Sequence, residues 1–247
     1  SLFALTYSVS GGLAAVAWTD VVQVIILILG GILMTGIALS YVTPGGGIID
    51  GLSYVYNAVP ERFSMILEKG EIITPDGRDA YFDLPGIAVL VGGMWIANTY
   101  YWGFNQYIIQ RTFAAKSLAE AQKGIAFAAF LKLIIPIFVV LPGIIAYVIN
   151  LDPATGELIK SLPEGFTSSD GRILNDNAAP WLIKNYIPVG IKGLILAALA
   201  AAIVSSLASM LNSTSTIFTM DIYKEYINKN ASDKKLVTVG RIVVIVA

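Results

Sequence analysis

Cysteine and histidine are both absent from the 247 residues of this chain. Their absence excludes disulfide bonds, zinc sites built from Cys and His, thiol nucleophiles and any His-based catalytic triad within it. No phosphate-binding or dinucleotide-binding glycine motif occurs in the strand–turn–helix context that it requires. Covalent catalysis therefore has little support, and we predict a protein that is not an enzyme and has no cofactor.

Charged residues are also scarce. They make up 13% of the sequence, against about 25% in ordinary soluble domains, while 56% of the residues are hydrophobic and the mean hydropathy is +0.72. So large a deficit means that much of the surface faces something other than water. The formal net charge of −1 gives no sign of the basic face that nucleic acid requires. The composition predicts a lipid bilayer as the surroundings, and no nucleic-acid partner.

Four apolar stretches approach or exceed the roughly 20 residues that a helix needs to cross a bilayer. They run over about 13–42, 85–110, 124–149 and 189–223, and a fifth begins near 237. Residues 1–9 are typical of the tail of an earlier helix, with a break at Gly11-Gly12. We therefore expect 1–247 to be a fragment of a single transmembrane domain, with the fold class of an all-α polytopic membrane protein.

The segments between these stretches alternate in charge. Residues 44–84 hold three Lys or Arg against seven Asp or Glu, and residues 150–188 hold three against five. The connections at 111–123 and 224–236 are short and basic, and short basic loops mark the cytoplasmic side of a membrane. We therefore predict that these two connections are cytoplasmic and that the long acidic ones are external.

The long external loops should contain structure of their own, because loops of about 40 residues rarely lack it. The segment 180–188 favours a short lid helix on the outer face. The segment 74–83, with Pro75, Asp76 and Gly77, is more typical of exposed turns.

Lys132 is a charged residue inside the third apolar stretch, among Phe130, Leu131, Leu133 and Ile134. A charge at the centre of a membrane helix costs about 2.5–3.5 kcal/mol on insertion scales, so it normally faces a cavity or a partner. A structural ion pair, or a lysine that extends to the membrane surface, would also explain it. We favour a functional role.

The second apolar stretch carries two Asn, one Gln, one Gly and five aromatic residues over 95–106. Asn and Gly do not favour a continuous helix there, whereas a broken helix is tolerated where its backbone lines a cavity. Aromatic rings cover the apolar faces of sugars, while Asn, Gln and Lys bond their hydroxyls. An aromatic belt at the membrane interface is the alternative. The cluster lies too deep in its stretch for that, and we predict a binding site.

The fourth stretch has small residues at helical spacing, at Ala198, Ala202, Ser206 and Ser209. Such a face lets another helix approach closely, which is a sufficient structural explanation. The adjacent Ser205 adds a second hydroxyl, and a helical serine hydroxyl lies near the carbonyl three or four residues back. With the Ala202 carbonyl, the two serines would suit a hard cation, which prefers oxygen ligands.

Asp20, in Trp18-Thr19-Asp20, lies near the cytoplasmic end of the first stretch. A carboxylate at a helix end or interface explains it as well as a place on an ion path does.

Taken together, these stretches resemble the sodium:solute symporter family. The resemblance covers nearly the whole chain and is weakest in the outer loops, and its matching parts are 11–20 (GGLAAVAWTD), 98–111, Lys132 in its stretch and 197–221. It implies part of a leucine-transporter-like inverted-repeat core, with substrate and sodium near the membrane midplane. The first core helix of that fold has no counterpart here, so we expect about half of each site.

The resemblance also implies roles for individual residues. In the family's sugar transporters, the matching positions make Asn98 and Lys132 hydrogen-bond donors to the sugar. Tyr101 would be an aromatic gate stacked on it.

On the sodium side, Ala202, Ser205 and Ser206 would be ligands, and Asp20 matches an acidic position linked to the sodium route. No metal other than sodium is expected.

The function implied is sodium-coupled symport of a hexose of the galactose or glucose type, by alternating access. The expected location is the cell (inner) membrane, in a multi-pass protein whose partners are sodium, a small sugar and the bilayer. Another small organic solute is the main alternative. A channel would need a repeated filter or ring of polar groups, and a membrane enzyme a nucleophile–base pair or metal set, and the sequence provides neither.

Overall fold

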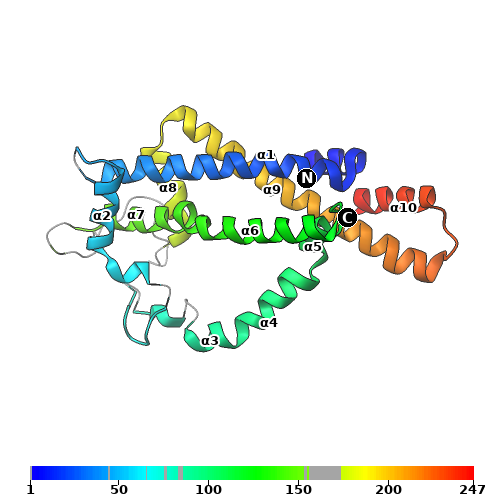
Figure 1. Cartoon of the computed structure of the whole chain (residues 1–247). Helices are drawn as coiled ribbons and strands as arrows, with labels where there is room; N and C mark the ends of the chain where they lie inside the picture. The colour runs from blue at the N-terminus through cyan, green and yellow to red at the C-terminus, as the bar shows by residue number, and fades with distance from the viewer. Residues whose placement is uncertain are drawn as a thin grey trace. The chain divides into compact units, whose positions relative to one another are not determined.

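The structure, a computed structural model, describes residues 2–43, 45–64, 66–74, 77–82, 86–152, 155 and 174–247. Over these residues it is almost entirely helical (Figure 1). The elements are, in chain order, α1 (Leu2–Val42), α2 (Ile48–Ala58), η1 (Pro60–Phe63), η2 (Ala80–Phe82), α3 (Ile87–Val91), α4 (Gly93–Thr99), η3 (Tyr100–Phe104), α5 (Gln106–Phe113), α6 (Leu118–Val139), α7 (Leu141–Ile149), η4 (Asn175–Asn177), α8 (Ala178–Tyr186), α9 (Val189–Ile217), η5 (Phe218–Ile227) and α10 (Asp233–Val246). The expected all-α class is confirmed for this part of the chain.

The chain divides into two compact units. Unit 1 comprises Ser1–Leu27, Thr99–Ala128 and Leu196–Ala247. Unit 2 comprises Ile28–Asn98 and Ala129–Ile195. Each unit therefore joins segments that are far apart in the sequence, and each is described by itself below.

Three helical segments are long and apolar enough to cross a membrane, namely Gly12–Val42, Leu118–Ile149 and Val189–Ile227. They overlap three of the four predicted stretches. A helix bonds all its backbone groups internally, which is what a segment in hydrocarbon requires.

The fourth predicted stretch, 85–110, is not one helix. From residue 86 onward it is divided into α3, α4, the π-helical turn η3 and α5, and Pro85 lies outside the described residues. Asn105 is extended, with φ −82° and ψ 109°, and its side-chain oxygen caps α5 by accepting from the Tyr107 amide at 3.2 Å. The interruption thus falls within the Gly- and Asn-containing run, where the sequence favours a broken helix.

Gly12 divides α1. Its φ of 55° and ψ of −152° are non-helical, and this left-handed region of φ favours glycine. The predicted break at Gly11-Gly12 is therefore confirmed, and the membrane-length part of α1 begins there.

An apolar core in unit 2 joins the end of α1 to α2, α7 and α8. Its buried members are Ala38, Leu39, Val55, Val59, Ile145, Ala146, Val148 and Leu182. Gly51 of α2 lies so close to α1 that a Cβ atom there would meet the Leu39 backbone carbonyl. Only glycine permits this close approach of α2 to α1.

A second close contact in unit 2 joins α1 to α6. A Cβ on Gly31 would lie 2.6 Å from the Phe138 Cβ, so the glycine makes room for that ring. One turn later, the Thr35 hydroxyl bonds the carbonyls of Gly31, at 2.9 Å, and Ile137, at 3.0 Å. Small residues on α1 thus allow both close packing and a bond between helices.

A short helix is expected near 180–188 and is present as α8, slightly earlier in the chain; its role as an outer lid stays a prediction. The ring of Tyr186 packs on Tyr41, with centroids 5.6 Å apart, and on Trp181, at 5.3 Å. Burial raises the pKa of the Tyr186 hydroxyl.

The predicted turns near 74–83 are also found where the structure describes them. The Thr74 amide donates to the Arg78 carbonyl at 2.8 Å, and Gly77 has a φ of 80°. Residues 75, 76 and 83 lie outside the described residues.

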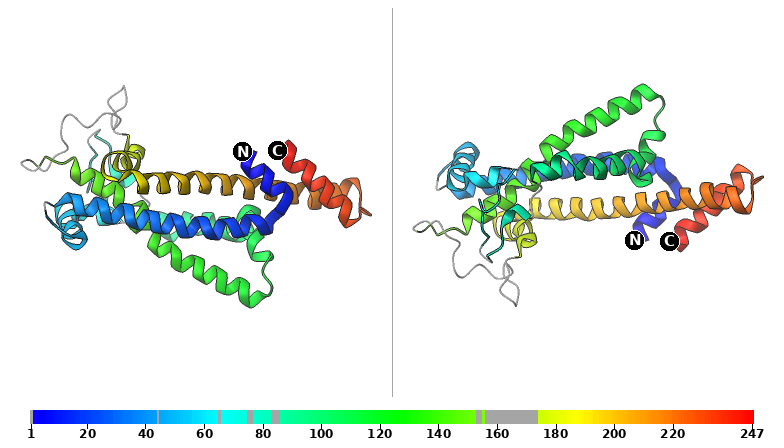
Figure 2. Two further views of the ribbon diagram at one scale, coloured as in Figure 1. Left: turned by 90° about the horizontal axis from the view of Figure 1, so that it is seen from above. Right: turned by 90° about the horizontal axis from the view of Figure 1, so that it is seen from below.

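In unit 1, α9 continues into the π-helical η5, and α10 then folds back against η5 (Figures 1 and 2). The Ser215 hydroxyl donates to the Gly240 carbonyl of α10 at 2.9 Å. A Cβ at Gly240 would lie 2.9 Å from that hydroxyl oxygen. The glycine therefore lets the two arms of this hairpin approach closely.

Candidate functional site

A polar cluster in unit 1 brings together α1, α5 and α9. The Asp20 carboxylate of α1 accepts hydrogen bonds on both oxygens: Ser205 of α9 donates its hydroxyl to Oδ1, and Arg111 of α5 donates its guanidinium to Oδ2. The same Nη2 atom of Arg111 also contacts the Ser209 hydroxyl at 2.5 Å. Asp20 and Arg111, 91 positions apart in sequence, are thus bonded to each other, and each also contacts a serine of α9.

The buried side-chain amide of Gln110 adds a further bond between α5 and α9 beside this cluster. Gln110, which is only 5% exposed, donates its side-chain N–H to the Ser209 carbonyl at 3.1 Å and to the Tyr107 carbonyl at 3.2 Å. Ser209 itself is fully buried. The end of α5 is therefore bonded to α9 by two consecutive residues, Gln110 and Arg111.

Small residues explain why α1 reaches α9 at this point. Val16 and Ala208 are both fully buried and pack together with Val204. Asp20 lies one helical turn after Val16, on the same side of α1. Ser205 and Ser209 are likewise one turn apart on α9, so the packing of small side chains delivers the carboxylate to the hydroxyls.

The cluster contains one negative and one positive side chain, and both are partly buried. The side chains of Asp20 and Arg111 are 18% and 34% exposed. Their charges compensate each other, and the carboxylate and hydroxyl oxygens are hard donors of the kind that bind alkali and alkaline-earth cations. Among the described residues, no group of three or more His, Cys, Asp or Glu suits a multivalent metal.

The three predicted sodium ligands all lie on one stretch of α9. Ser205 is buried, while Ala202 and Ser206 are half-buried. The Ser205 hydroxyl bonds Asp20 across the helix interface. One of the three predicted ligands is therefore bonded to Asp20, the residue predicted on the sodium route, and the roles of both stay predictions.

The predicted sugar residues are described singly. Asn98 is an exposed residue of α4 whose side-chain amide donates to the Met94 carbonyl at 2.9 Å. Tyr101, in the π-helical η3, is 41% exposed and packs edge-on against Trp102 with ring centroids 5.1 Å apart. Lys132 is an exposed residue of α6. Asn98 and Lys132 belong to unit 2 and Tyr101 to unit 1, so their meeting in one pocket stays a prediction.

Three members of the cluster were missed by the sequence reasoning: Arg111, Ser209 and Gln110. Arg111 was counted with the basic cytoplasmic connection, and Ser209 as a small packing residue. One signal pointed to such a partner, because an acid such as Asp20 within a membrane helix normally pairs with another group.

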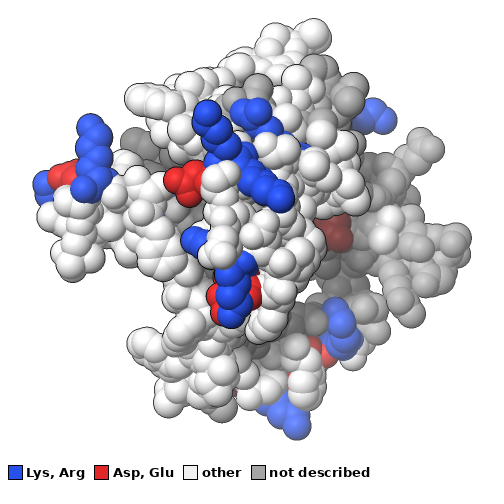
Figure 3. Space-filling model, turned by 90° about the vertical axis from the view of Figure 1, so that its right-hand side faces the viewer, with Lys and Arg blue, Asp and Glu red and all other residues white. Residues whose placement is uncertain are grey.

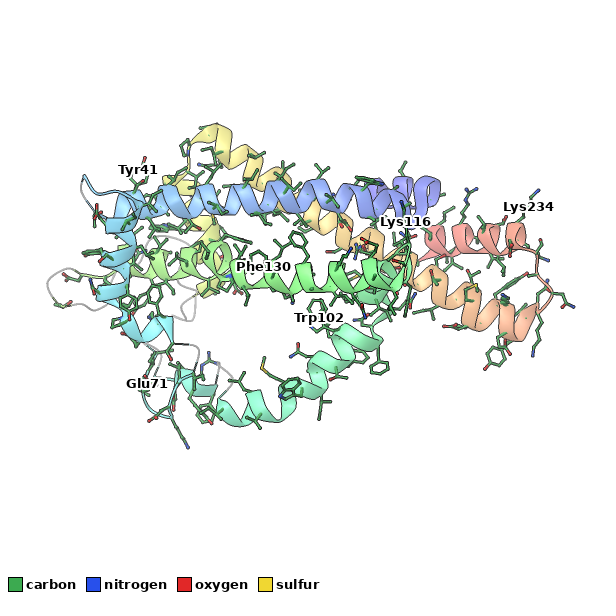
Figure 4. All side chains as sticks on the ribbon, viewed as in Figure 1. Tyr41, Glu71, Trp102, Lys116, Phe130 and Lys234 are labelled. Carbon is green, nitrogen blue, oxygen red and sulfur yellow. The ribbon has the colours of Figure 1, made fainter. Side chains whose placement is uncertain are left out.

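The short basic connections both belong to unit 1. Lys116 lies between α5 and α6, and Lys234 lies in the first turn of α10 (Figure 4). Figure 3 shows several Lys and Arg side chains, some with Asp or Glu side chains beside them, on the face that it draws. The cytoplasmic orientation stays a prediction that rests on the charge bias of the sequence.

Known proteins resemble this chain over its whole length. A sodium/glucose cotransporter of Vibrio parahaemolyticus is 58% identical over 248 residues, which cover 100% of this chain and 44% of that protein. The human sodium/myo-inositol cotransporter 2 is 36% identical over 258 residues, covering 99% of this chain and 36% of that protein. The chain thus spans less than half the length of these relatives.

A solved structure shows the same fold. It is a sodium-coupled sialic acid symporter in a substrate-bound, outward-open state, 28% identical, with a TM-score of 0.75. The match covers 100% of this chain and 47% of that one. The expected fold class, part of a leucine-transporter-like core in an all-α polytopic membrane protein, is confirmed.

The sequence profile of the Sodium:solute symporter family matches residues 2–247. The members of this family are symporters and not enzymes, and three helices of the described residues are long and apolar enough to cross a membrane. Sodium is the coupling ion of this family, and a solute is its substrate. The chain therefore belongs to the sodium:solute symporter family.

Proposed function

We propose that the protein moves a hexose of the galactose or glucose type across the cell (inner) membrane together with sodium. The observation that carries this proposal is the 58% identity, over the entire chain, to a sodium/glucose cotransporter. Transport would proceed by alternating access, in which the gates on the two sides open in turn and no covalent bond is broken.

For sodium, we propose the Ala202 carbonyl and the Ser205 and Ser206 hydroxyls as ligands, with Asp20 on the ion's path. The bond between Ser205 and Asp20 supports this assignment, because it sets a negative charge beside the first of the two serines. A sodium ion at the serines is attracted by that charge even without direct coordination.

For the sugar, we propose Asn98 and Lys132 as hydrogen-bond donors and Tyr101 as the stacking gate. The broken helix supports this assignment, because η3 and the extended Asn105 interrupt regular structure in the run that carries Asn98 and Tyr101. Interrupted helices with aromatic rings suit a site that must both bind and release a polar solute.

A second substrate class has one observation in its favour. The human relative at 36% identity is a sodium/myo-inositol cotransporter, and myo-inositol shows the ring and hydroxyl pattern of a hexose without its ring oxygen. The same polar donors would suit it. The identity to the glucose cotransporter is higher, so we favour the hexose.

The test is uptake of radiolabelled galactose, glucose and myo-inositol by the full-length protein in proteoliposomes. A sodium gradient should drive hexose accumulation above the outside concentration, and collapse of that gradient should stop it. Equal uptake in sodium and in choline would contradict the proposal, and preference for myo-inositol would replace the hexose.

A further inference from the structure

Arg111 shares a carboxylate with a candidate sodium ligand. Its guanidinium bonds Oδ2 of Asp20, while the Ser205 hydroxyl bonds Oδ1 of the same side chain. A guanidinium is not deprotonated in proteins, so Arg111 carries a fixed positive charge. Whatever attraction Asp20 exerts on a cation at the serines is therefore opposed by a fixed positive charge within the same cluster.

This guanidinium is held in place by more than its charge. It contacts the Ser209 hydroxyl at 2.5 Å, and the neighbouring Gln110 bonds the Ser209 carbonyl at 3.1 Å. Gln110 and Ser209 are both buried. The arrangement is a specific one in which the last turn of α5 presents Arg111 to α9.

Other ion pairs of the structure differ from this one. Lys123 meets Glu120 at 2.9 Å within α6, and Lys229, in the turn after η5, meets Glu225 of η5 at 3.4 Å; all four side chains are more than half exposed. Only a small contribution is expected from such pairs. The pair of Arg111 and Asp20 joins two helices, α5 and α1, and its side chains are less exposed, at 34% and 18%.

We propose that Arg111 is a positioning residue that acts as a resident counter-cation, competing with sodium for the Asp20 carboxylate. This inference rests on the proposed function, since it assigns regulation of the same ion site. While Arg111 is bonded to Asp20, its positive charge compensates that of the carboxylate, and the serines bind sodium weakly. When Arg111 withdraws, the carboxylate strengthens the site. Sodium and the bond between Arg111 and Asp20 are then antagonists, linked by a reciprocal coupling.

Sodium activation curves of sugar uptake by the full-length protein test this. Arg111→Gln should lower the half-activating sodium concentration about tenfold, a typical coupling between two sites. Asp20→Asn should raise it. The double variant should match Asp20→Asn alone, because Arg111 acts only through that carboxylate. Lys123→Gln, which removes a nearby cation outside the cluster, is the matched control and should leave the curve unchanged.

The competing explanation is that Arg111 is only a structural brace. In that case Arg111→Gln would reduce the maximal rate or the amount of folded protein and leave the half-activating sodium concentration unchanged or raised, which overturns the proposal. If Arg111→Gln does not fold, Arg111→Lys decides. A lysine lacks the forked geometry and bonds the carboxylate less well. It should lower the half-activating concentration by about two- to fivefold, a smaller part of the same coupling.

The two proposals fail in different ways. Uptake by the unmodified protein that needs no sodium overturns the proposed function and this inference with it. Sodium-dependent uptake whose half-activation does not fall in either Arg111 variant overturns the counter-cation alone.

Discussion

Unit 2 has an apolar core that joins four helices, whereas in unit 1 a charged cluster joins α1, α5 and α9. In unit 2, Ile145 and Leu182 are fully buried in a core that spans four helices. In unit 1, the comparable contact is made by Val16 and Ala208, and beside it Asp20, Arg111 and Ser205 are bonded to one another.

The difference matters for a transporter. Apolar packing has few alternative arrangements of equal energy, because large side chains interdigitate and leave voids when they move. Small residues leave smaller voids, and a carboxylate can exchange a guanidinium for a hydrated ion. The polar cluster is thus the better candidate for an element with two states, and unit 2 for a rigid support.

Ile145→Ala in unit 2 should have the largest effect. Truncating a fully buried isoleucine costs about 2–5 kcal/mol, from lost burial and the cavity left behind. Thermal unfolding of the full-length protein in detergent measures the loss. The protein that stays folded should keep its half-activating sodium concentration, and a shifted value would mean that unit 2 is no passive support. Ile49→Ala, at a residue 82% exposed on α2, is the control.

Asn98→Ala and Lys132→Ala should each weaken sugar binding by about 1–3 kcal/mol, because a polar partner on the sugar is left unpaired. Sugar dependence of uptake at saturating sodium measures this. Tyr101→Ala should also weaken binding, while Tyr101→Phe should keep most of it, since stacking needs the ring and not the hydroxyl. Normal sugar affinity in folded Asn98→Ala and Lys132→Ala would show that the substrate pocket lies elsewhere.

Ser206→Ala in unit 1 should weaken sodium binding by about 0.5–1.5 kcal/mol, the usual net value of one polar contact. Alanine keeps the small helix face, so packing is preserved. The half-activating sodium concentration should rise about two- to tenfold, and the apparent sugar affinity should shift with it by linkage. An unchanged sodium curve with continued transport would leave close packing as the only role of this serine.

Lys116→Cys should have the smallest effect, because Lys116 is exposed between α5 and α6. Uptake should be unchanged, and the cysteine, alone in a chain that has none, should react with a membrane-impermeant reagent only from the cytoplasmic side. Labelling from outside alone would invert the orientation assigned to the basic end of unit 1.

Several features follow from the sequence by itself. The apolar runs predict the long helices, since hydrocarbon admits only segments that satisfy their own backbone. Gly12 predicts the break in α1, and the Gly- and Asn-containing run around residue 100 favours the interrupted helix that the structure contains. Each of these depends on local conformational preference or on transfer to lipid, and both are properties of neighbouring residues.

Pairing between distant residues was decided by the tertiary structure alone. The sequence placed Asp20 at a helix end or interface or on an ion path, and Ser205 as a hydroxyl on a helix with a face of small residues. Nothing in either pattern names Arg111 as the group that meets them. Helical periodicity tells which residues share a face and not which helix that face meets. The contact depends on how Val16 and Ala208 pack, and packing is a property of the folded chain.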